Sequence, residues 1–243
     1  QKTDKNIQLL KENRTSLINH CITKGLNPNV EMKDSGVEWI GDIPSHWDTI
    51  KGKYILKILT GNYPDKLIEK LNGINFIKVD DLNNTNDNYY LNKSKLVLEE
   101  DSNVVPLEEN IILFPKRGMT IFTNKVVICK VKSYIDPNLM GIKIFSNSNI
   151  KFILLCIKNR GLGDICDLST IPQINNKHIY PLKFPFPLLE EQNQIVEYLD
   201  EKTQKIDSTI EKETKRIELL KEYRQSLISE VVTGKVDVRE WNN

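Results

Sequence analysis

The sequence lacks the features that mark several protein classes. It has no alanine, and its four cysteines form no CxxC pair. Its three histidines, His20, His46 and His178, are scattered. These counts argue against a zinc site or a disulfide framework and fit a reducing cytoplasm. No apolar run is long enough to span a membrane, and the chain shows no N-terminal signal pattern.

Motifs for catalysis are also missing. The chain contains no Asn/Asp-Pro-Pro-aromatic motif, which an amino-methyltransferase would need. The Gly161-x-Gly163 pair lacks the strand and helix that flank a phosphate-binding loop. No cluster of carboxylate, histidine and cysteine side chains suggests a metal site. These absences leave no candidate residues for catalysis or for a metal ion.

The chain as a whole has no large excess of positive or negative charge, but its individual segments do. The chain has 34 Lys and Arg against 33 Asp and Glu, a net charge of +1. Residues 111–189, however, carry 11 positive and 3 negative side chains, or +8, whereas residues 32–110 carry −5 and residues 190–243 carry −4. Fields act within about 8 Å in physiological salt, so the basic segment can attract phosphates despite the neutral total. An ordinary solvated lysine surface explains the charge alone slightly better.

A long internal repeat is the strongest signal within the sequence. Residues 6–23 and 216–233 are identical at ten of 18 positions, and a glycine follows each copy, Gly25 and Gly234. Such glycines are typical of helix ends. The offset of 210 residues is too long for a solenoid repeat. We expect two such units in tandem in the natural protein, with this chain as the tail of one and the whole of the next.

The second copy belongs to a segment that predicts one long helix. Residues 190–232 contain no Gly or Pro, and isoleucines recur every eleven residues, a spacing that keeps one face of a helix apolar. The 43 residues would extend about 64 Å, which favours a coiled-coil spacer. Residues 6–22 are its expected antiparallel partner. The candidate assembly residues are Ile195, Leu199, Ile206, Ile210, Ile217, Leu220, Leu227 and Val231.

The region between the helical segments predicts an α+β globular domain. Short β-like runs at 74–79, 111–114, 121–129 and 142–145 are separated by loops rich in Asn, Asp, Gly and Pro. Residues 151–158 fit either a strand or a short buried helix. Residues 181–187, PLKFPFP, predict a helix-incompatible bridge into the long helix. The predicted architecture is a globular domain with short mixed strands, mounted on a long coiled-coil-forming C-terminal helix.

Three blocks resemble a known family. MKDSGVEWIGDIPSHWD at 32–48 resembles the opening of a target-recognition domain in specificity subunits of type I restriction–modification systems. FPKRGMTIFTNKVVI and YIDPNLMGI resemble its central portion, and residues 185–239 resemble its junction into a conserved helical region. The resemblance implies three parts: the end of a preceding helical region at 1–31, a target-recognition domain at 32–189, and the second conserved helix with a C-terminal tail at 190–243. The chain would be the C-terminal half of such a subunit, and the first recognition domain is absent from it.

The resemblance also implies partners. Such a subunit reads one half of a bipartite double-stranded DNA target and positions methyltransferase and restriction subunits, while a half-length form can dimerise. The resemblance implies that the chain itself is not an enzyme and holds no cofactor, and that S-adenosylmethionine, Mg and ATP would be bound by the partner subunits. Two alternatives stay open: the recognition segment of a single-chain restriction–methylation enzyme, and a coiled-coil adaptor whose globular head binds protein.

DNA reading requires cations for phosphates and polar side chains for base edges. Lys116 and Arg117 flank Gly118, which would let the backbone approach a phosphate. Trp39 and Trp47 fit packing better than base stacking. The candidate DNA-binding residues are Asn62, Lys66, Lys116, Arg117, Asn124, Lys125, Arg160, Thr170, Gln173 and Lys177.

Overall fold

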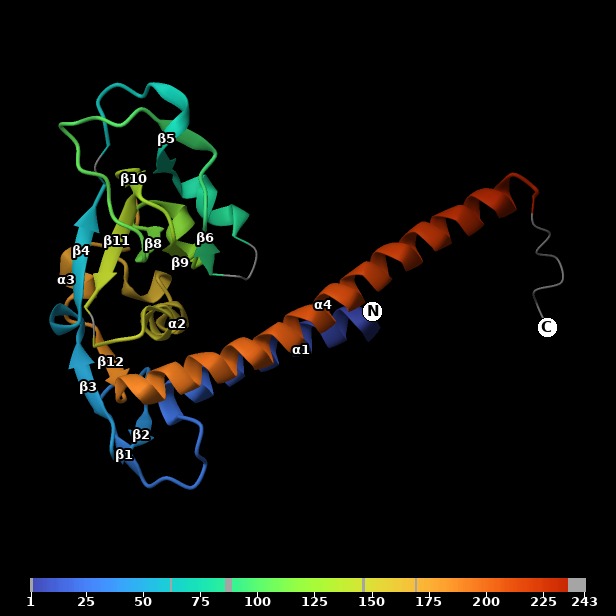
Figure 1. Ribbon diagram of the computed structural model, residues 1–243. Coiled ribbons are helices and arrows are strands. Elements are labelled where there is room, and N and C mark those ends of the chain that lie inside the picture. The colour runs from blue at the N-terminus through green and yellow to red at the C-terminus, as the bar shows by residue number, and fades with distance from the viewer. Residues whose placement is uncertain (1, 62, 86–88, 146, 169, 236–243) are drawn as a thin grey trace. The chain divides into compact units, whose positions relative to one another are not determined.

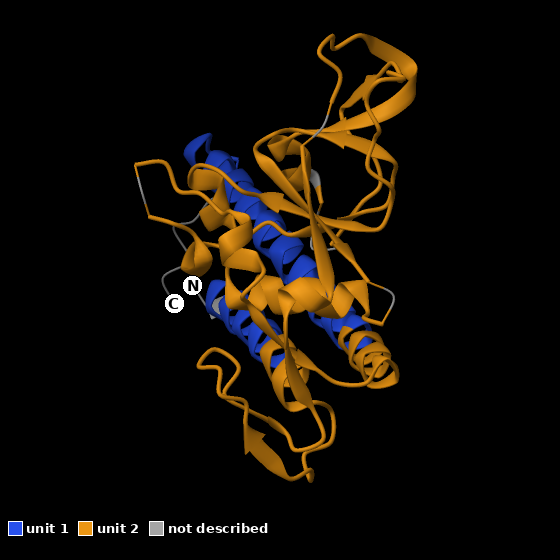
Figure 2. Ribbon diagram, turned by 90° about the vertical axis from the view of Figure 1, so that its left-hand side faces the viewer, with its two compact units in different colours: residues 1–17, 200–243 blue, residues 18–199 orange. Residues whose placement is uncertain are grey.

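Figure 1 shows the computed structural model, which describes residues 2–61, 63–85, 89–145, 147–168 and 170–235. The chain divides into two compact units, one of residues 1–17 with 200–243 and one of residues 18–199 (Figure 2). Both boundaries fall inside helices, α1 (Lys2–Lys24) and α4 (Leu189–Val232). The compact unit 18–199 therefore includes the end of α1 and the start of α4, which the sequence-based division at 32 and 189 leaves outside.

The largest sheet of the unit 18–199 has the strand order β4-β11-β8-β9-β6. The strands are β4 (Leu56–Thr60), β6 (Tyr90–Leu91), β8 (Ile111–Pro115), β9 (Val127–Cys129) and β11 (Leu139–Ile144). Strand β11 pairs antiparallel with β4 and β8, β8 pairs antiparallel with β9, and β6 pairs parallel with β9. Every residue of the central strand β8 is buried, as its unbroken apolar run IILF indicates.

A second sheet has the order β10-β5-β7. Its strands are β5 (Glu69–Ile77), β7 (Leu96–Leu98) and β10 (Ser133–Ile135). Ile77 and Ile135 from this sheet share one apolar cluster with Ile111, Leu113 and Val127 from the larger sheet. The core between the two sheets therefore fixes β8, whose C-terminal end leads into the candidate site.

Helix α2 (Ile150–Arg160) settles the ambiguous segment 151–158 as a helix. Asn149 caps its start, because its side-chain oxygen accepts hydrogen bonds from the backbone N–H groups of Lys151 (2.9 Å) and Phe152 (3.1 Å). Gly161, with φ of 82°, ends it. Every residue from 151 to 157 is buried, and the helix contacts β8 and β9.

Two short sheets and several single turns complete the unit 18–199. The sheets pair β1 (Met32–Asp34) with β2 (Asp42–Pro44), and β3 (Asp48–Lys51) with β12 (Lys183–Phe186). Helix α3 spans Asn176–Ile179, and the 3-10 turns are η1 (Gly52–Tyr54), η2 (Val79–Asn84), η3 (Met119–Thr123) and η4 (Gly163–Ile165).

One segment contains an unpredicted strand, and one segment prediction was wrong. Residues 181–187 are not helical and lead into α4, as predicted, but they also contain strand β12, in which Phe184 pairs with Ile50 of β3. A proline is tolerated there because this sheet has two strands, each with a free edge. Residues 121–129 do not form one strand, because η3 runs to Thr123 and Asn124 adopts a left-handed conformation with φ of 50° before β9 begins at Val127.

Trp47 joins the helix ends within the unit 18–199. Its side chain is fully buried, and its indole N–H donates a 2.9 Å hydrogen bond to the Glu191 carboxylate near the start of α4. Gly25, just after α1, lies so close that a Cβ there would stand 3.2 Å from the Trp47 ring. The prediction that Trp47 packs inside the protein is confirmed.

The other unit pairs the remaining parts of α1 and α4 side by side (Figure 2). The Arg14 guanidinium donates two hydrogen bonds to the Asp207 carboxylate, at 2.7 and 3.1 Å. Because Arg14 meets Asp207 while Gly25, further along the chain, meets the earlier residue Glu191, the two helices run antiparallel, as predicted. Both repeat copies are helical, and Gly25 (φ 76°) and Gly234 (φ 73°) follow them as expected.

The predicted apolar stripe of α4 divides into three environments. Ile195 and Leu199 are buried in the unit 18–199, with 0% and 2% exposure. Leu220 is 53% exposed. The other five are half-buried: Ile206, Ile210, Ile217, Leu227 and Val231. The stripe therefore packs inside the unit 18–199 at its start and is partly or largely accessible from Ile206 onward.

Candidate nucleic-acid interface

Two loops meet beyond the C-terminal end of β8. The backbone N–H of Ile174 donates to the Lys116 carbonyl (2.8 Å), and the N–H of Gly118 donates to the Pro172 carbonyl (2.9 Å). Arg117 and Gln173 form an antiparallel bridge between these bonds. We call residues 116–118 and 167–177 the paired loops. Four sequence-predicted residues, Lys116, Arg117, Gln173 and Lys177, are thus brought onto one local surface, together with the exposed Thr170.

Gly118 forms the turn that joins the paired loops. Its φ of 81° and ψ of −174° suit glycine alone, and a Cβ there would meet nothing within 4 Å. Its N–H donates to the Pro172 carbonyl. The glycine is therefore required for this turn, and the expected approach of its backbone to a phosphate stays a prediction.

Asp167 holds the second loop in place. Its carboxylate accepts hydrogen bonds from Lys177 Nζ (2.7 Å) and His178 Nε2 (3.1 Å). His178 Nδ1 accepts from the Asn175 N–H (2.8 Å), which assigns the ring proton to Nε2. Lys177 first, and then His178, keep the pKa of the Asp167 carboxyl below its usual value. Lys177 is therefore partly neutralised.

Unlike Lys177, the cations Lys116, Arg117 and Lys125 are not neutralised by a carboxylate of the described residues. Within the described ranges of the chain, no acidic side chain forms an ion pair with any of these three. Arg117 is exposed, and Lys116 and Lys125 are half-buried. Long cationic side chains without an internal counterion create the positive potential that attracts phosphates.

The side chain of Asn124 forms hydrogen bonds with backbone groups near the end of α2. Its side-chain N–H donates to the Lys158 carbonyl (2.8 Å), and its side-chain oxygen accepts from the Leu162 N–H (3.1 Å). These two bonds tie the end of η3 to the end of α2. The side-chain amide is already engaged within the protein, which favours a structural role over the base contact expected from the sequence.

Lys158 lies next to Asn124, and Lys151 and Lys130, like Lys158, lie near the rings of Tyr89 or Tyr90. Lys158 Nζ donates to the Asn124 carbonyl (3.3 Å) and lies 5.7 Å from the centre of the Tyr89 ring. Lys151 Nζ lies 5.5 Å from the Tyr89 ring and 5.1 Å from the Tyr90 ring, and Lys130 Nζ lies 5.2 Å from Tyr90. The rings hold the ammonium groups by cation–π attraction. The low acid content of residues 111–189 could have indicated these lysines, but not their tyrosine partners, which precede that segment.

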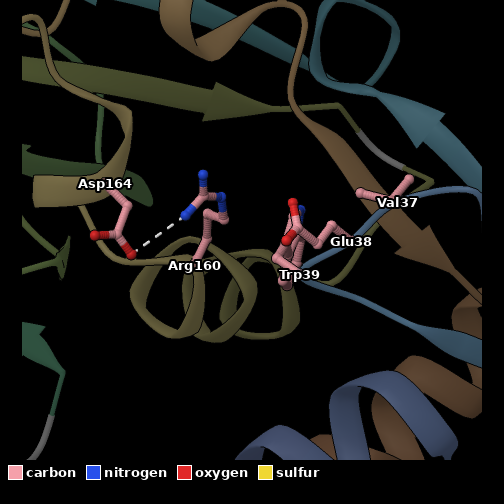
Figure 3. A pocket seen from close by; sticks show the side chains of 5 residues that line it. All are labelled: Val37, Glu38, Trp39, Arg160 and Asp164. Carbon is pink, nitrogen blue, oxygen red and sulfur yellow. Dashed lines mark hydrogen bonds and ion pairs between the residues drawn. The ribbon is translucent and has the colours of Figure 1, made fainter.

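Arg160, the last residue of α2, lines a separate hollow of about 570 Å³ with Val37, Glu38, Trp39 and Asp164 (Figure 3). Its guanidinium forms a 3.3 Å ion pair with Asp164. The hollow combines both signs of charge, so it is a poorer phosphate site than the paired loops.

Two candidates belong to the segment between β4 and β5. Lys66 lines a hollow of about 400 Å³ together with Asp65, Glu99, Glu100 and Asp101, whose carboxylates would repel phosphate. Asn62 lies outside the described residues.

The described residues contain no group of three or more His, Cys, Asp or Glu side chains that could hold a metal ion. No helix among them is long and apolar enough to cross a membrane.

The fold resembles that of solved type I specificity subunits. A chain from a study of complex assembly and conformational transition of the type I R-M system matches with a TM-score of 0.69 and 16% identity, over 94% of this chain and 55% of that chain. The HsdS subunit from Thermoanaerobacter tengcongensis matches with a TM-score of 0.63 and 14% identity, over 96% of this chain and 53% of that chain. The chain therefore shares the fold of these solved structures.

The chain belongs to the type I restriction modification DNA specificity domain family, whose model matches residues 44–221. It is also similar to the type I restriction enzyme MjaVIII specificity subunit of Methanocaldococcus jannaschii, with 26% identity over 98% of this chain and 57% of that subunit. The putative MjaX specificity subunit of the same organism is 24% identical over 97% of this chain and 53% of its own length. The chain spans about half the length of the curated relatives it matches.

Proposed function

We propose that this chain is a DNA sequence-recognition part of a type I restriction–modification complex, and that it reads one half of a bipartite target in double-stranded DNA. The observation that carries the proposal is the surface of the paired loops. It combines two cations that form no ion pair with an acidic side chain of the described residues, Lys116 and Arg117, with the exposed Thr170 and the half-buried Gln173 on a backbone fixed to the core strand β8. Cations supply affinity and polar side chains supply base choice.

In this proposal the chain performs no covalent chemistry. Methyltransferase subunits bind the helical part of the chain, and restriction subunits join through the complex. S-adenosylmethionine, Mg and ATP are bound by those partners. When the other recognition domain is missing, a second copy of the chain dimerises with it and recognises the other half of the target. The complex acts in the cytoplasm. The family membership and the accessible apolar side chains of α4 support this division of roles.

The DNA contact is tested by charge removal on the paired loops. Lys116→Gln and Arg117→Gln should weaken duplex binding, because each variant neutralises fewer phosphates. The slope of log affinity against log salt should fall by about 0.9 for each phosphate that the variant no longer neutralises. The measurement is fluorescence anisotropy at several salt concentrations.

Lys70→Gln is the matched control, because Lys70 pairs with Glu99 (3.2 Å) on an acidic part of the surface. Its slope should equal that of the unaltered protein. An unchanged slope in both loop variants would remove the paired loops from the interface.

A further inference from the structure

Three apolar side chains project from the paired loops and the adjoining turn η3. Met119 is 72% exposed, Leu168 is 79% exposed and Ile171 is 45% exposed. The hydrogen bond from Gly118 to Pro172 places Met119 and Ile171 next to each other, and the Asp167–Gln173 bridge closes the loop that carries Leu168. We call these three residues the apolar tip.

The charges around the apolar tip determine what can cover it. Lys116 and Arg117 adjoin it, and the nearby carboxylate of Asp167 is engaged by Lys177 and His178. Leu71 offers a contrast, because it is 99% exposed on β5 but lies in an acidic stretch near Glu69 and the Lys70–Glu99 pair. A polyanion can approach the apolar tip, whereas the acidic surroundings of Leu71 repel it.

Duplex DNA offers an apolar group of the right kind. In the major groove, thymine presents its 5-methyl group, and apolar side chains are the usual contacts for it. The adenine of the same base pair presents N7 and N6, which a glutamine amide can bind in a bidentate manner. Gln173 stands two residues from Ile171, so one short segment carries partners for both bases of an A·T pair.

We infer that the apolar tip contacts thymine methyl groups in the major groove, and that the half-site read by this chain contains A·T pairs at that position. The inference rests on the proposed function. It adds a base preference to the surface, whereas the cations alone provide affinity for any sequence.

The test replaces thymine by uracil, which pairs identically but lacks the methyl group. The preferred half-site is first selected from random duplexes with the full chain, and binding is then compared between its thymine and uracil forms. The unaltered protein should bind about fourfold less tightly for each contacted methyl that is removed. Leu168→Ser and Met119→Ser should bind the thymine form more weakly and lose most of this sensitivity.

Leu71→Ser is the matched control and should retain both the affinity and the full sensitivity to uracil. Equal binding of thymine and uracil duplexes by the unaltered protein overturns the inference, and so does full uracil sensitivity in the tip variants. If uracil has no effect but the tip variants bend DNA less, the side chains act as wedges between base steps. That result also overturns the inference while leaving the proposed function intact. Failure to select any sequence overturns both.

Discussion

At the scale of single residues, Asn124 and Arg117 show why composition alone could not separate structural side chains from accessible ones. Both lie in the basic segment and both can contact DNA. The side-chain amide of Asn124 makes two hydrogen bonds to the backbone at the end of α2, whereas Arg117 projects from a loop whose backbone is already paired. The difference depends on contacts 34 to 56 residues apart along the chain, which a local pattern does not contain.

The burial of the cysteines leads to a prediction about the reactivity of each thiol. Cys21, Cys129 and Cys156 are buried, and Cys166 is half-buried. Burial raises the pKa of the Cys21 thiol to about 11 and also raises the pKa values of Cys129 and Cys156. Because the thiolate is the reactive form, a thiol reagent at pH 8 should label Cys166 alone in the native protein. Mass spectrometry of the labelled protein measures this.

A Cys166→Ser variant should then show almost no labelling until the protein is unfolded. Rapid labelling of Cys156 in the native protein would contradict the packing of α2, in which that residue is fully buried.

At the scale of elements, the sequence predicted the long helix and the central strand well. The absence of Gly and Pro from 190–232 and the buried run IILF are strong local signals, and both elements form. Strand β12 was missed because Pro185 inside it argues against a strand, while its pairing with β3 depends on residues more than 130 positions earlier. Segment 151–158 stayed ambiguous because an apolar run of that length suits a strand or a helix equally.

Helix α4 permits a prediction that separates folding from assembly. Ile195→Asp places a carboxylate in the core of the unit 18–199 and should destabilise it by about 3 to 5 kcal/mol. Ile206→Asp and Ile217→Asp alter half-buried positions of the other unit. They should abolish association with a methyltransferase subunit and leave the melting of the globular unit nearly unchanged.

Gel filtration with the co-expressed methyltransferase and thermal unfolding measure the two effects. Lys215→Gln, at an exposed position two residues before Ile217, is the control and should preserve the complex. Intact complexes formed by both isoleucine variants would exclude this face of α4 from assembly.

At the scale of the whole molecule, the net charge of +1 hides surfaces suited to different partners. The cations of the paired loops suit phosphates, whereas the acidic hollow at Lys66 and the accessible apolar positions of α4 suit proteins. Sequence patterns indicated the basic segment and also placed Lys66 among the DNA-binding candidates. The structure adds the acids at 99–101, from a separate segment, to its sequence neighbour Asp65. Local electrostatics therefore describe this chain better than its total charge.

The central claim is that this chain reads one half of a bipartite DNA target for a methyltransferase. Methylome sequencing of host cells with and without the intact gene tests it most directly, with the partner methyltransferase present in both. We predict a two-part adenine-methylated motif that requires the gene and becomes less completely methylated when Lys116 and Arg117 are both replaced by Gln. Identical methylation with and without the gene would contradict the claim.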